Sequence, residues 1–548
     1  MVLVVAAAIV RRGGENGSEP VRAPLPRTPA RLDERFTVPR DTIPIAWHPW
    51  SSALFARAQR ERTPVVALLD AAWCESCQLY AATLASSRAA RAALENDVLA
   101  VRVDVDRRPD VHARYHVTFD TLPTLIFLDP DGGVWDLTDA QQPSELVDAI
   151  AELRRSRQPR ADPELEWLSQ AAATRRHAPT PRAGRVPAAE ADSLVTEIVG
   201  SLVDAWPHAE EVLELDTPLL EWDVMRFLRR HVERRASPLS RRLFLQGLRQ
   251  VVAAPLFRDG SILREVEGAE DRVARARFLE TNATLLDHFR LAAEWSGEDL
   301  YAEAARRVER FLIDTLFNAD AGLFCDAQGT IVLDENGWPL LRGSEHARMG
   351  EHLRSEGLEP HVVPVFTIPG NARALVALRE KELVEPALAR LWEQVERRGY
   401  VPHDLTLDAA GVLQASRFEF LQDVVELGDA ILALRPHLTQ SDLWLARCRT
   451  LADALLARFR SPEEVLLLDA PYAERPRTPA RMRVPLTPIT VNARAVEFLL
   501  QLGAETGEER YRAAALQLLR ACVLALESAS VWEATEVGSA ILCGRATQ

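Results

Sequence analysis

Residues 70–80 read DAAWCESCQLY and place two cysteines, Cys74 and Cys77, directly after Trp73. The apolar, partly β-branched run PVVALLDA at 64–71 predicts a buried strand just before them, and a helix is expected from about residue 74. The pair therefore stands where a strand gives way to a helix. The first turn of a helix offers unpaired N–H groups and a positive dipole end, which stabilise a thiolate, the reactive form of cysteine.

Three interpretations of the cysteine pair are open: a redox pair, half of a metal site, or two inert cysteines placed together by chance. A zinc site needs a second cysteine pair or histidines at ligand spacing. The closest histidines, His112 and His116, have no second cysteine pair with them. The sequence therefore predicts no metal and no cofactor at this position.

A proline further along the chain favours the redox interpretation. The stretch TLPT places Pro123 before an apolar strand, 46 residues after Cys77, where a thioredoxin-like fold holds a cis-proline opposite its cysteines. In this interpretation Cys74 is the nucleophile and Cys77 resolves the mixed disulfide. Pro123 and Trp73 are then expected to face the substrate, a protein dithiol or disulfide.

The buried acid that assists proton transfer in thioredoxins has no direct counterpart. It lies six residues before the first cysteine, and that position is Leu68 here. Asp70 would point to the same face of the strand, but roughly 7 Å further along. We therefore expect Asp70 to take the place of that buried acid only if the strand register is shifted.

The surrounding pattern alternates between helices and strands from 41 to 157. A serine opens an amphipathic helix at 51–62, VLAVRVDVD at 98–106 is a second strand, and PSELVDAIAELRRSR at 143–157 is a closing helix. Strands separated by helices predict a small α/β sheet domain with a thioredoxin-like fold. Residues 1–40 are expected to be an irregular tail, and the Pro- and Arg-rich residues 158–190 a linker.

From 191 to 548 the chain shows helical periodicity and little strand pattern. The stretch 282–312 aligns with 492–522 at an offset of 210 residues, which superposes an Asn-Ala pair, a glycine and a tyrosine. A shorter relative begins at Asn371. Each block predicts a helical hairpin, which buries its apolar face only by packing beside others. About 350 residues of such hairpins predict an all-α (α/α)6 toroid.

The net charge, the cysteine count and the apolar start of the chain limit its expected partners and location. The 548 residues carry a net charge of −15, which gives no electrostatic footprint for nucleic acid. Six cysteines do not form a disulfide framework and suit a reducing, cytoplasmic location. The apolar start MVLVVAAAIV is too short to span a bilayer. An exported protein is the alternative, if the true start lies upstream of Met1.

The N-terminal pattern resembles the two-domain thioredoxin-like family that includes spermatogenesis-associated protein 20 and many bacterial proteins. The resemblance covers roughly residues 43 to 135 and rests on a tryptophan before the first helix, the C-x-x-C pair, and a strand that ends in Val-Asp followed by Arg-Pro-Asp and a tyrosine. The matching residues are Trp47, Cys74, Cys77, Val103, Asp104, Arg108, Pro109, Asp110 and Tyr115.

This resemblance implies a second domain similar to N-acylglucosamine 2-epimerases and six-hairpin glycosidases. Such toroids process sugars with acids and histidines at the ends of their inner helices. His403 and Asp404, in the loop GYVPHDLTLD at 399–408, are the main candidates here, with His361, Glu419 and Asp423 as further ones. Two functions are therefore carried forward. One is thiol–disulfide exchange with a toroid that binds a partner or a carbohydrate. The other is a carbohydrate isomerase or hydrolase, or a non-catalytic scaffold.

Overall fold

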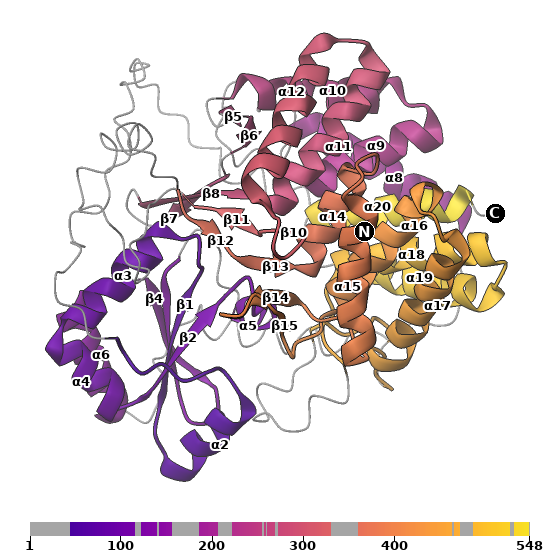
Figure 1. Ribbon diagram of the computed structural model, residues 1–548. Helices are drawn as coiled ribbons and strands as arrows, with labels where there is room; N and C mark the ends of the chain where they lie inside the picture. Colours follow the sequence, from indigo (N-terminus) through magenta and orange to yellow (C-terminus); the bar gives the residue numbers. More distant parts are fainter. Residues whose placement is uncertain are drawn as a thin grey trace, which may run out of the picture.

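The structure is a computed structural model (Figure 1). Described are residues 44–115, 122–139, 142–155, 186–205, 222–254, 257–258, 260–262, 264–268, 272–329, 360–462, 465–471, 486–526 and 531–546. The tail expected at 1–40 and the linker as far as residue 185 lie outside the described residues. Within the described ranges, no helix has both the length and the apolar composition needed to cross a membrane.

The N-terminal part is built on a four-stranded sheet in the order β2-β1-β3-β4. β1 and β2 are parallel, whereas β3 is antiparallel to both β1 and β4. The strands are β1 (Val65–Asp70), β2 (Leu99–Asp104), β3 (Thr124–Leu128) and β4 (Val134–Asp139). The helices are α2 (Ser52–Glu61), α3 (Glu75–Ser86), α4 (Arg88–Asn96), α5 (Pro109–Arg114) and α6 (Pro143–Arg155). This order confirms the thioredoxin-like fold predicted from the sequence.

Every side chain of β1 is buried because the sheet is covered on both faces. Val66 and Leu68 pack into a core formed with α3, α4 and α6. Val65, Ala67 and Leu69 point the other way, toward α2 and α5. The alternation of side chains along a strand thus divides one apolar run between two cores.

The second part is an all-α toroid, as the helical hairpins predicted. Six described helices form an inner ring: α9 (Trp222–Arg235), α11 (Leu279–Ser296), α14 (Ile368–Ala377), α16 (Leu421–Leu434), α18 (Ile489–Thr506) and α20 (Val531–Ala546). Each packs on the next, α20 packs on α9, and an ion pair between Arg229 and Asp287 joins α9 to α11. Outside them lie α8 (Ala188–Ala205), α10 (Pro238–Ala253), α12 (Asp299–Phe311), α15 (Val384–Arg398), α17 (Ser441–Arg458) and α19 (Glu509–Ala525).

The internal repeat corresponds to whole hairpins. The block at 282 lies in α11 and α12, and the block at 492 lies in α18 and α19. The aligned glycines, Gly297 and Gly507, end the first helix of each hairpin with φ of 71° in both cases. Only glycine adopts that left-handed conformation without a steric cost, which explains why both blocks have it.

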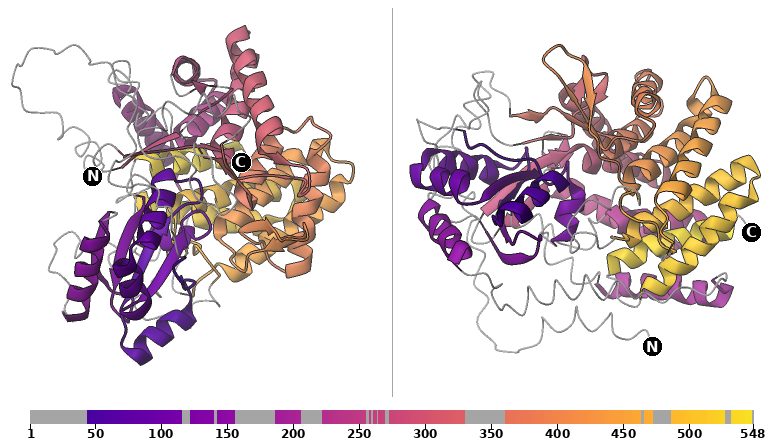
Figure 2. Two further views of the ribbon diagram at one scale, coloured as in Figure 1. Left: turned by 60° about the vertical axis from the view of Figure 1, so that its left-hand side comes forward. Right: turned by 90° about the horizontal axis from the view of Figure 1, so that it is seen from below.

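Short strands accompany the helices after residue 191 and form further sheets. A second sheet has the order β12-β11-β8-β7 and a third the order β13-β14-β15. Their strands are β7 (Arg264–Gly268), β8 (Arg272–Phe278), β11 (Ala327–Gln328), β12 (Val362–Val363), β13 (Val365–Thr367), β14 (Asp404–Leu407) and β15 (Leu413–Ala415). Most of these strands are too short for alternation to be detected. They lie between the thioredoxin-like sheet and the toroid helices (Figures 1 and 2), and β8 packs against α3.

Candidate redox site and domain joint

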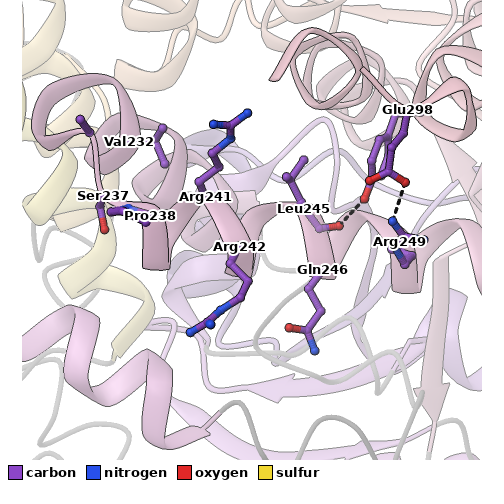
Figure 3. Close-up of a pocket in the computed structure, with 11 residues that line it drawn as sticks. Val232, Ser237, Pro238, Arg241, Arg242, Leu245, Gln246, Arg249 and Glu298 are labelled. Atoms are coloured by element: carbon purple, nitrogen blue, oxygen red, sulfur yellow. Dashed lines mark hydrogen bonds and ion pairs between the residues drawn. The ribbon is translucent and has the colours of Figure 1, made fainter. Parts of the chain in front are cut away.

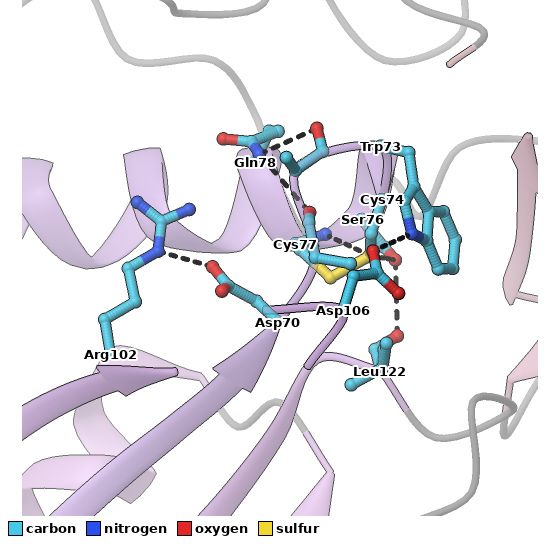
Figure 4. Close-up of a disulfide and its surroundings, with 11 residues drawn as sticks. Asp70, Trp73, Cys74, Ser76, Cys77, Gln78, Arg102, Asp106 and Leu122 are labelled. Carbon is cyan, nitrogen blue, oxygen red and sulfur yellow. Dashed lines mark hydrogen bonds and ion pairs between the residues drawn. A yellow bond between two sulfur atoms is a disulfide. The ribbon is translucent and has the colours of Figure 1, made fainter. Parts of the chain in front are cut away.

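Cys74 and Cys77 form a disulfide at the start of α3 (Figure 4). Their Cα atoms are 5.2 Å apart. Cys74 is the N-cap residue of α3, and its Sγ accepts a hydrogen bond from the backbone N–H of Cys77 at 3.1 Å. The Ser76 hydroxyl lies 3.4 Å from the same sulfur. The pair lies at the helix start, as the sequence predicted, with one backbone N–H directed at Cys74.

The structure also brings Pro123 to the site. The Leu122–Pro123 peptide bond is cis, as the sequence predicted. Ser76 donates a hydrogen bond to the Leu122 carbonyl at 3.3 Å, which ties the C-x-x-C turn to the residue before the proline. Three of the predicted site residues, Cys74, Cys77 and Pro123, therefore share one location.

The cysteine pair is covered in this conformation. Cys74 and Cys77 are fully buried, and Trp73 is 1% exposed. The indole of Trp73 packs edge-on against Phe278 of β8, with ring centroids 4.9 Å apart. The same apolar cluster takes in Ala276 and Ala327 of the second sheet. Trp73 thus faces the toroid's strands rather than an open surface.

The acid that contacts the cysteine motif is not the one that the sequence suggested. Asp70 is the last residue of β1, and its carboxylate accepts a hydrogen bond from Arg102 at 2.5 Å. Burial raises the pKa of Asp70, and Arg102 opposes that shift. The carboxylate that reaches the redox motif is Asp106, which accepts the Trp73 indole N–H at 2.6 Å. Burial, with the nearby Asp104 and Asp326, raises the pKa of Asp106 well above its ordinary value.

Sequence reasoning missed Asp106, although one signal was available. The stretch VRVDVD puts alternating aspartates at the carboxyl end of β2. β1 ends beside it, because the two strands are parallel and pair Asp70 with Asp104. Polar residues at the carboxyl ends of neighbouring parallel strands meet at one edge of a sheet, which is where the cysteines also lie.

His403 and Asp404 lie where the toroid meets the thioredoxin-like sheet. The Nε2 of His403 is 2.7 Å from the backbone oxygen of Asp106. Asp404 accepts a hydrogen bond from Nε of Arg107 at 2.9 Å. Both toroid residues are buried, at 6% and 0% exposure. The structure therefore places these two predicted residues against the loop that follows β2.

The other ring nitrogen of His403 faces a carboxylate. Nδ1 is 2.7 Å from Oδ1 of Asp423, and the second oxygen of Asp423 accepts the Phe420 N–H at 2.7 Å. The Asp106 carbonyl can only accept, and Asp423 accepts when it is ionised, so with an ionised Asp423 both ring nitrogens donate and the ring is cationic. Burial alone would lower the pKa of His403, but Asp423 and the Asp106 carbonyl raise it to about 9.

The remaining candidates are dispersed. Glu419 pairs with Arg458 at 2.7 Å and accepts the Val401 N–H at 2.9 Å. Burial lowers the pKa of His361, whose carbonyl accepts the Gly329 N–H at 2.9 Å. Neither residue makes a described contact with the disulfide. Across the described ranges, no group of three or more His, Cys, Asp or Glu residues has an arrangement that could hold a metal ion.

The centre of the toroid holds a network of arginines and carboxylates. Arg494 of α18 contacts Glu426 of α16, Glu536 of α20 and Asp223 of α9. Arg373 of α14 contacts Glu426 from the opposite side, at 2.7 Å. Further members are Arg226, Arg230, Glu280 and Glu497. These inner-ring acids are thus engaged with guanidinium groups.

A hollow of about 620 Å³ lies elsewhere, on the outer side of the toroid between α9, α10 and the start of α12 (Figure 3). Three exposed arginines line it: Arg241, Arg242 and Arg249. Arg241 donates to the Trp295 carbonyl and Arg249 pairs with Glu298. No residue of the redox pair or of the domain joint lines this hollow, so it forms no part of the candidate site.

Comparisons with known proteins agree with the N-terminal assignment. Residues 34–138 match the family model described as "Protein of unknown function, DUF255" (Thioredox_DsbH). Human spermatogenesis-associated protein 20 is 25% identical over 136 residues, which is 24% of this chain. The matched part spans only 16% of that curated relative's length.

Two of the solved structures that are similar to part of this chain are enzymes that act on sugars, by their descriptions. A D-mannose isomerase is 13% identical and matches 55% of this chain and 74% of its own, with a TM-score of 0.39. An unsaturated glucuronyl hydrolase specific for heparin is 10% identical and matches 65% of this chain and 98% of its own, with a TM-score of 0.43.

The motif-based resemblance therefore stands for the N-terminal part. The family-model match covers the cysteine pair, the loop after β2 and most of the sheet. Residues 34–138 of this chain are similar to the thioredoxin-like family of unknown function that this family model describes, and 136 residues of the chain are similar to spermatogenesis-associated protein 20.

Proposed function

We propose that this chain is a thiol–disulfide oxidoreductase that acts through Cys74 and Cys77 on a protein dithiol or disulfide. One observation carries the proposal: the two cysteines are joined at the N-terminus of α3, beside a cis-proline, in a thioredoxin-like sheet. The N–H of Cys77 is already directed at the Cys74 sulfur, so the helix start supplies a donor for the thiolate that exchange requires.

The reaction proceeds in two exchange steps. In the reduced protein, the Cys74 thiolate attacks one sulfur of a substrate disulfide, a mixed disulfide forms, and the substrate's other sulfur leaves as a thiolate. The Cys77 thiolate then attacks Cys74 Sγ and releases the second substrate thiolate. Two electrons pass from the cysteine pair to the substrate, and the pair ends as the disulfide seen here. A substrate dithiol drives the same steps in reverse.

Burial of the pair sets a condition on this chemistry. Both sulfurs are fully covered, and Phe278 of β8 packs over Trp73. A protein substrate therefore reaches Cys74 only after the toroid's strands move away from the site. The toroid thus serves as a cover for the redox pair, and we expect partner binding to displace it.

A carbohydrate reaction in the toroid is the second function that the sequence suggested, with His403 and Asp404 at its centre. The contacts of both residues favour the redox proposal instead. Both ring nitrogens of His403 have oxygen partners, and Asp404 is fully buried, with one of its two oxygens paired with Arg107 and neither reachable by a substrate in this conformation. A general acid or base needs a free position directed at the substrate.

The test is reduction of insulin disulfides by the purified chain with a small dithiol as the electron source. We expect turnover by the wild type and loss to the uncatalysed rate in Cys74→Ser. Cys77→Ser is expected to accumulate a mixed disulfide with the substrate, because the resolving thiol is missing. Cys522→Ala, at a buried cysteine of α19, is the matched control and should retain activity. Equal rates in the wild type and Cys74→Ser would overturn the proposal.

Ser76 is expected to tune the nucleophile. Its hydroxyl is 3.4 Å from Cys74 Sγ and can donate to the thiolate once the pair is reduced. A hydrogen bond to the charged form lowers a pKa. Ser76→Ala should therefore raise the pKa of the Cys74 thiol by about half a unit to one unit. Thiolate absorbance against pH in a Cys77→Ser background measures this. Ser86→Ala, on the exposed end of α3, should leave the thiol pKa unchanged.

A further inference from the structure

The loop after β2 meets residues 403–418 of the toroid, the segment that contains β14 and β15. Residues 106 to 108 of the loop each make a contact with this segment. The Asp106 carbonyl lies 2.7 Å from His403 Nε2, and Arg107 pairs with Asp404 at 2.9 Å. The Arg108 guanidinium lies over the Phe418 ring, 4.4 Å from its centroid. We call these three residues and their partners His403, Asp404 and Phe418 the joint.

The joint is held firmly on both sides. Within the thioredoxin-like part, the Asp104 carboxylate accepts the Asp106 N–H at 3.1 Å, and the Asp104 carbonyl accepts the Arg108 N–H at 3.0 Å. Within the toroid, Asp423 binds the His403 ring, which also packs edge-on against Phe420 at 5.0 Å. A change at His403 is therefore transmitted to Asp106 rather than absorbed by a loose loop.

Asp106 links the joint to the redox motif. Its backbone oxygen bonds the toroid through His403, while its side chain holds the indole of Trp73 at 2.6 Å. Trp73 directly precedes Cys74 (Figure 4). Its indole packs edge-on against Phe278. A continuous path of hydrogen bonds and one peptide link thus runs from Asp423 through His403, Asp106 and Trp73 to Cys74.

We propose that His403 is a positioning residue for the redox pair: through Asp106 it fixes Trp73 and the toroid's strands over the Cys74–Cys77 disulfide. Its importance for catalysis depends on the proposed thiol–disulfide exchange. Its effect on access to the disulfide does not, because access is a property of the closed joint whatever reaction the pair performs.

The proposal gives the joint a dependence on pH. Charged and titratable groups face His403 from each neighbouring element: Asp423 of α16, Asp106 of the loop after β2, Asp404 of β14 and Asp326 before β11. Asp423 and Asp404 favour the cationic ring, whereas burial raises the pKa of Asp106 and of Asp326 and so opposes their ionisation. When the ring loses a proton, one of its two acceptor partners faces a nitrogen lone pair, and either the Asp423 or the Asp106 contact is lost.

The experiment measures how fast a small phosphine reduces the disulfide in the full-length chain, between about pH 6 and pH 10. Alkylation of the freed thiols, followed by mass spectrometry, gives the fraction of disulfide that has been reduced. We expect His403→Ala to accelerate reduction at neutral pH about tenfold, the factor for loss of one hydrogen bond to a charged group. His403→Gln retains an N–H for the Asp106 carbonyl and should remain within about threefold of the wild type.

The pH profile separates positioning from a general loss of stability. The rate of disulfide reduction in the wild type, divided by the rate in His403→Gln at the same pH, should rise as the pH passes about 9, where His403 loses its proton. In Asp423→Asn the rise should begin at a lower pH, because the partner that favours the cation is neutral. His437→Gln, the same change at an exposed toroid histidine, should match the wild type throughout.

The outcomes are distinguishable from those of the insulin assay. A His403→Ala rate equal to that of the wild type, or a ratio to His403→Gln that is flat across the pH range, would overturn the positioning role. Should insulin reduction be absent while His403→Ala still speeds the phosphine reaction, the joint is supported and only the enzymatic function fails. Slower phosphine reduction in His403→Ala would also contradict the proposal.

Discussion

Replacing Arg494 with leucine is expected to lower the free energy of unfolding by about 3–5 kcal/mol. The guanidinium is 13% exposed and contacts carboxylates from three other inner helices, Asp223, Glu426 and Glu536. Leucine supplies no charge, so Asp223 and Glu426, whose pKa values Arg494 helps to lower, lose a cation. Glu536, whose pKa burial raises to about 8, loses a hydrogen-bond donor. Breaking a buried pair from one side is costly because the remaining charge stays buried without compensation.

Chemical denaturation followed by circular dichroism measures this loss. Arg397→Leu is the matched control, because Arg397 pairs with Glu393 on the exposed face of α15 and its side chain is 58% exposed. Such a surface pair contributes less than about 1 kcal/mol. Adding Asp223→Asn to Arg494→Leu should restore part of the loss, since one uncompensated charge is removed. If Arg494→Leu and Arg397→Leu had the same midpoint, the network would contribute no more than a surface ion pair.

The network also bears on function. Burial alone would raise the pKa of Glu426, but Arg373 and Arg494 hold it well below its usual range. Glu426 therefore stays ionised and paired under any ordinary condition. An acid in that state cannot donate a proton to a leaving group.

The N-terminal half of this architecture followed from the sequence because its signals are local. Ser51 caps α2, the β1 run is apolar throughout, and Cys74 occupies the helix start that its position after a strand predicted. The hairpins of the toroid were equally local, since a glycine in the left-handed conformation marks where α11 and α18 end. Each feature depends on residues within one or two turns of each other.

Local sequence signals could not predict the contacts of the joint. His403 and Asp106 are separated by 297 positions, and no periodicity connects them. The sequence made His403 a candidate for acid–base chemistry, but it was expected to face a sugar rather than a neighbouring sheet. The strands that cover the cysteines were missed for a related reason. β11 has two residues, and its pairing with β8 joins segments about 50 residues apart.

Asn492→Ala is expected to destabilise the chain by about 2–4 kcal/mol, although asparagine is a poor helix former and alanine the best one. The side chain is fully buried. Its Oδ1 accepts the Leu467 N–H at 2.7 Å, and its Nδ2 donates to the Leu467 carbonyl at 3.0 Å and the Pro488 carbonyl at 2.8 Å. One amide thus satisfies both backbone groups of a buried connecting residue, which alanine would leave unpaired.

The repeat makes this a test of the whole toroid. Asn282 and Asn371 occupy the same fourth position of α11 and α14, and each exchanges two hydrogen bonds with one connecting residue, Ile262 or Phe324. Substituting alanine at either should cost a similar amount. Asn96→Ala is the control, because that side chain is exposed and bonds only within α4. Thermal or denaturant unfolding compares the four variants. Equal stability of Asn492→Ala and Asn96→Ala would show that the repeated asparagine is not what joins each inner helix to its connection.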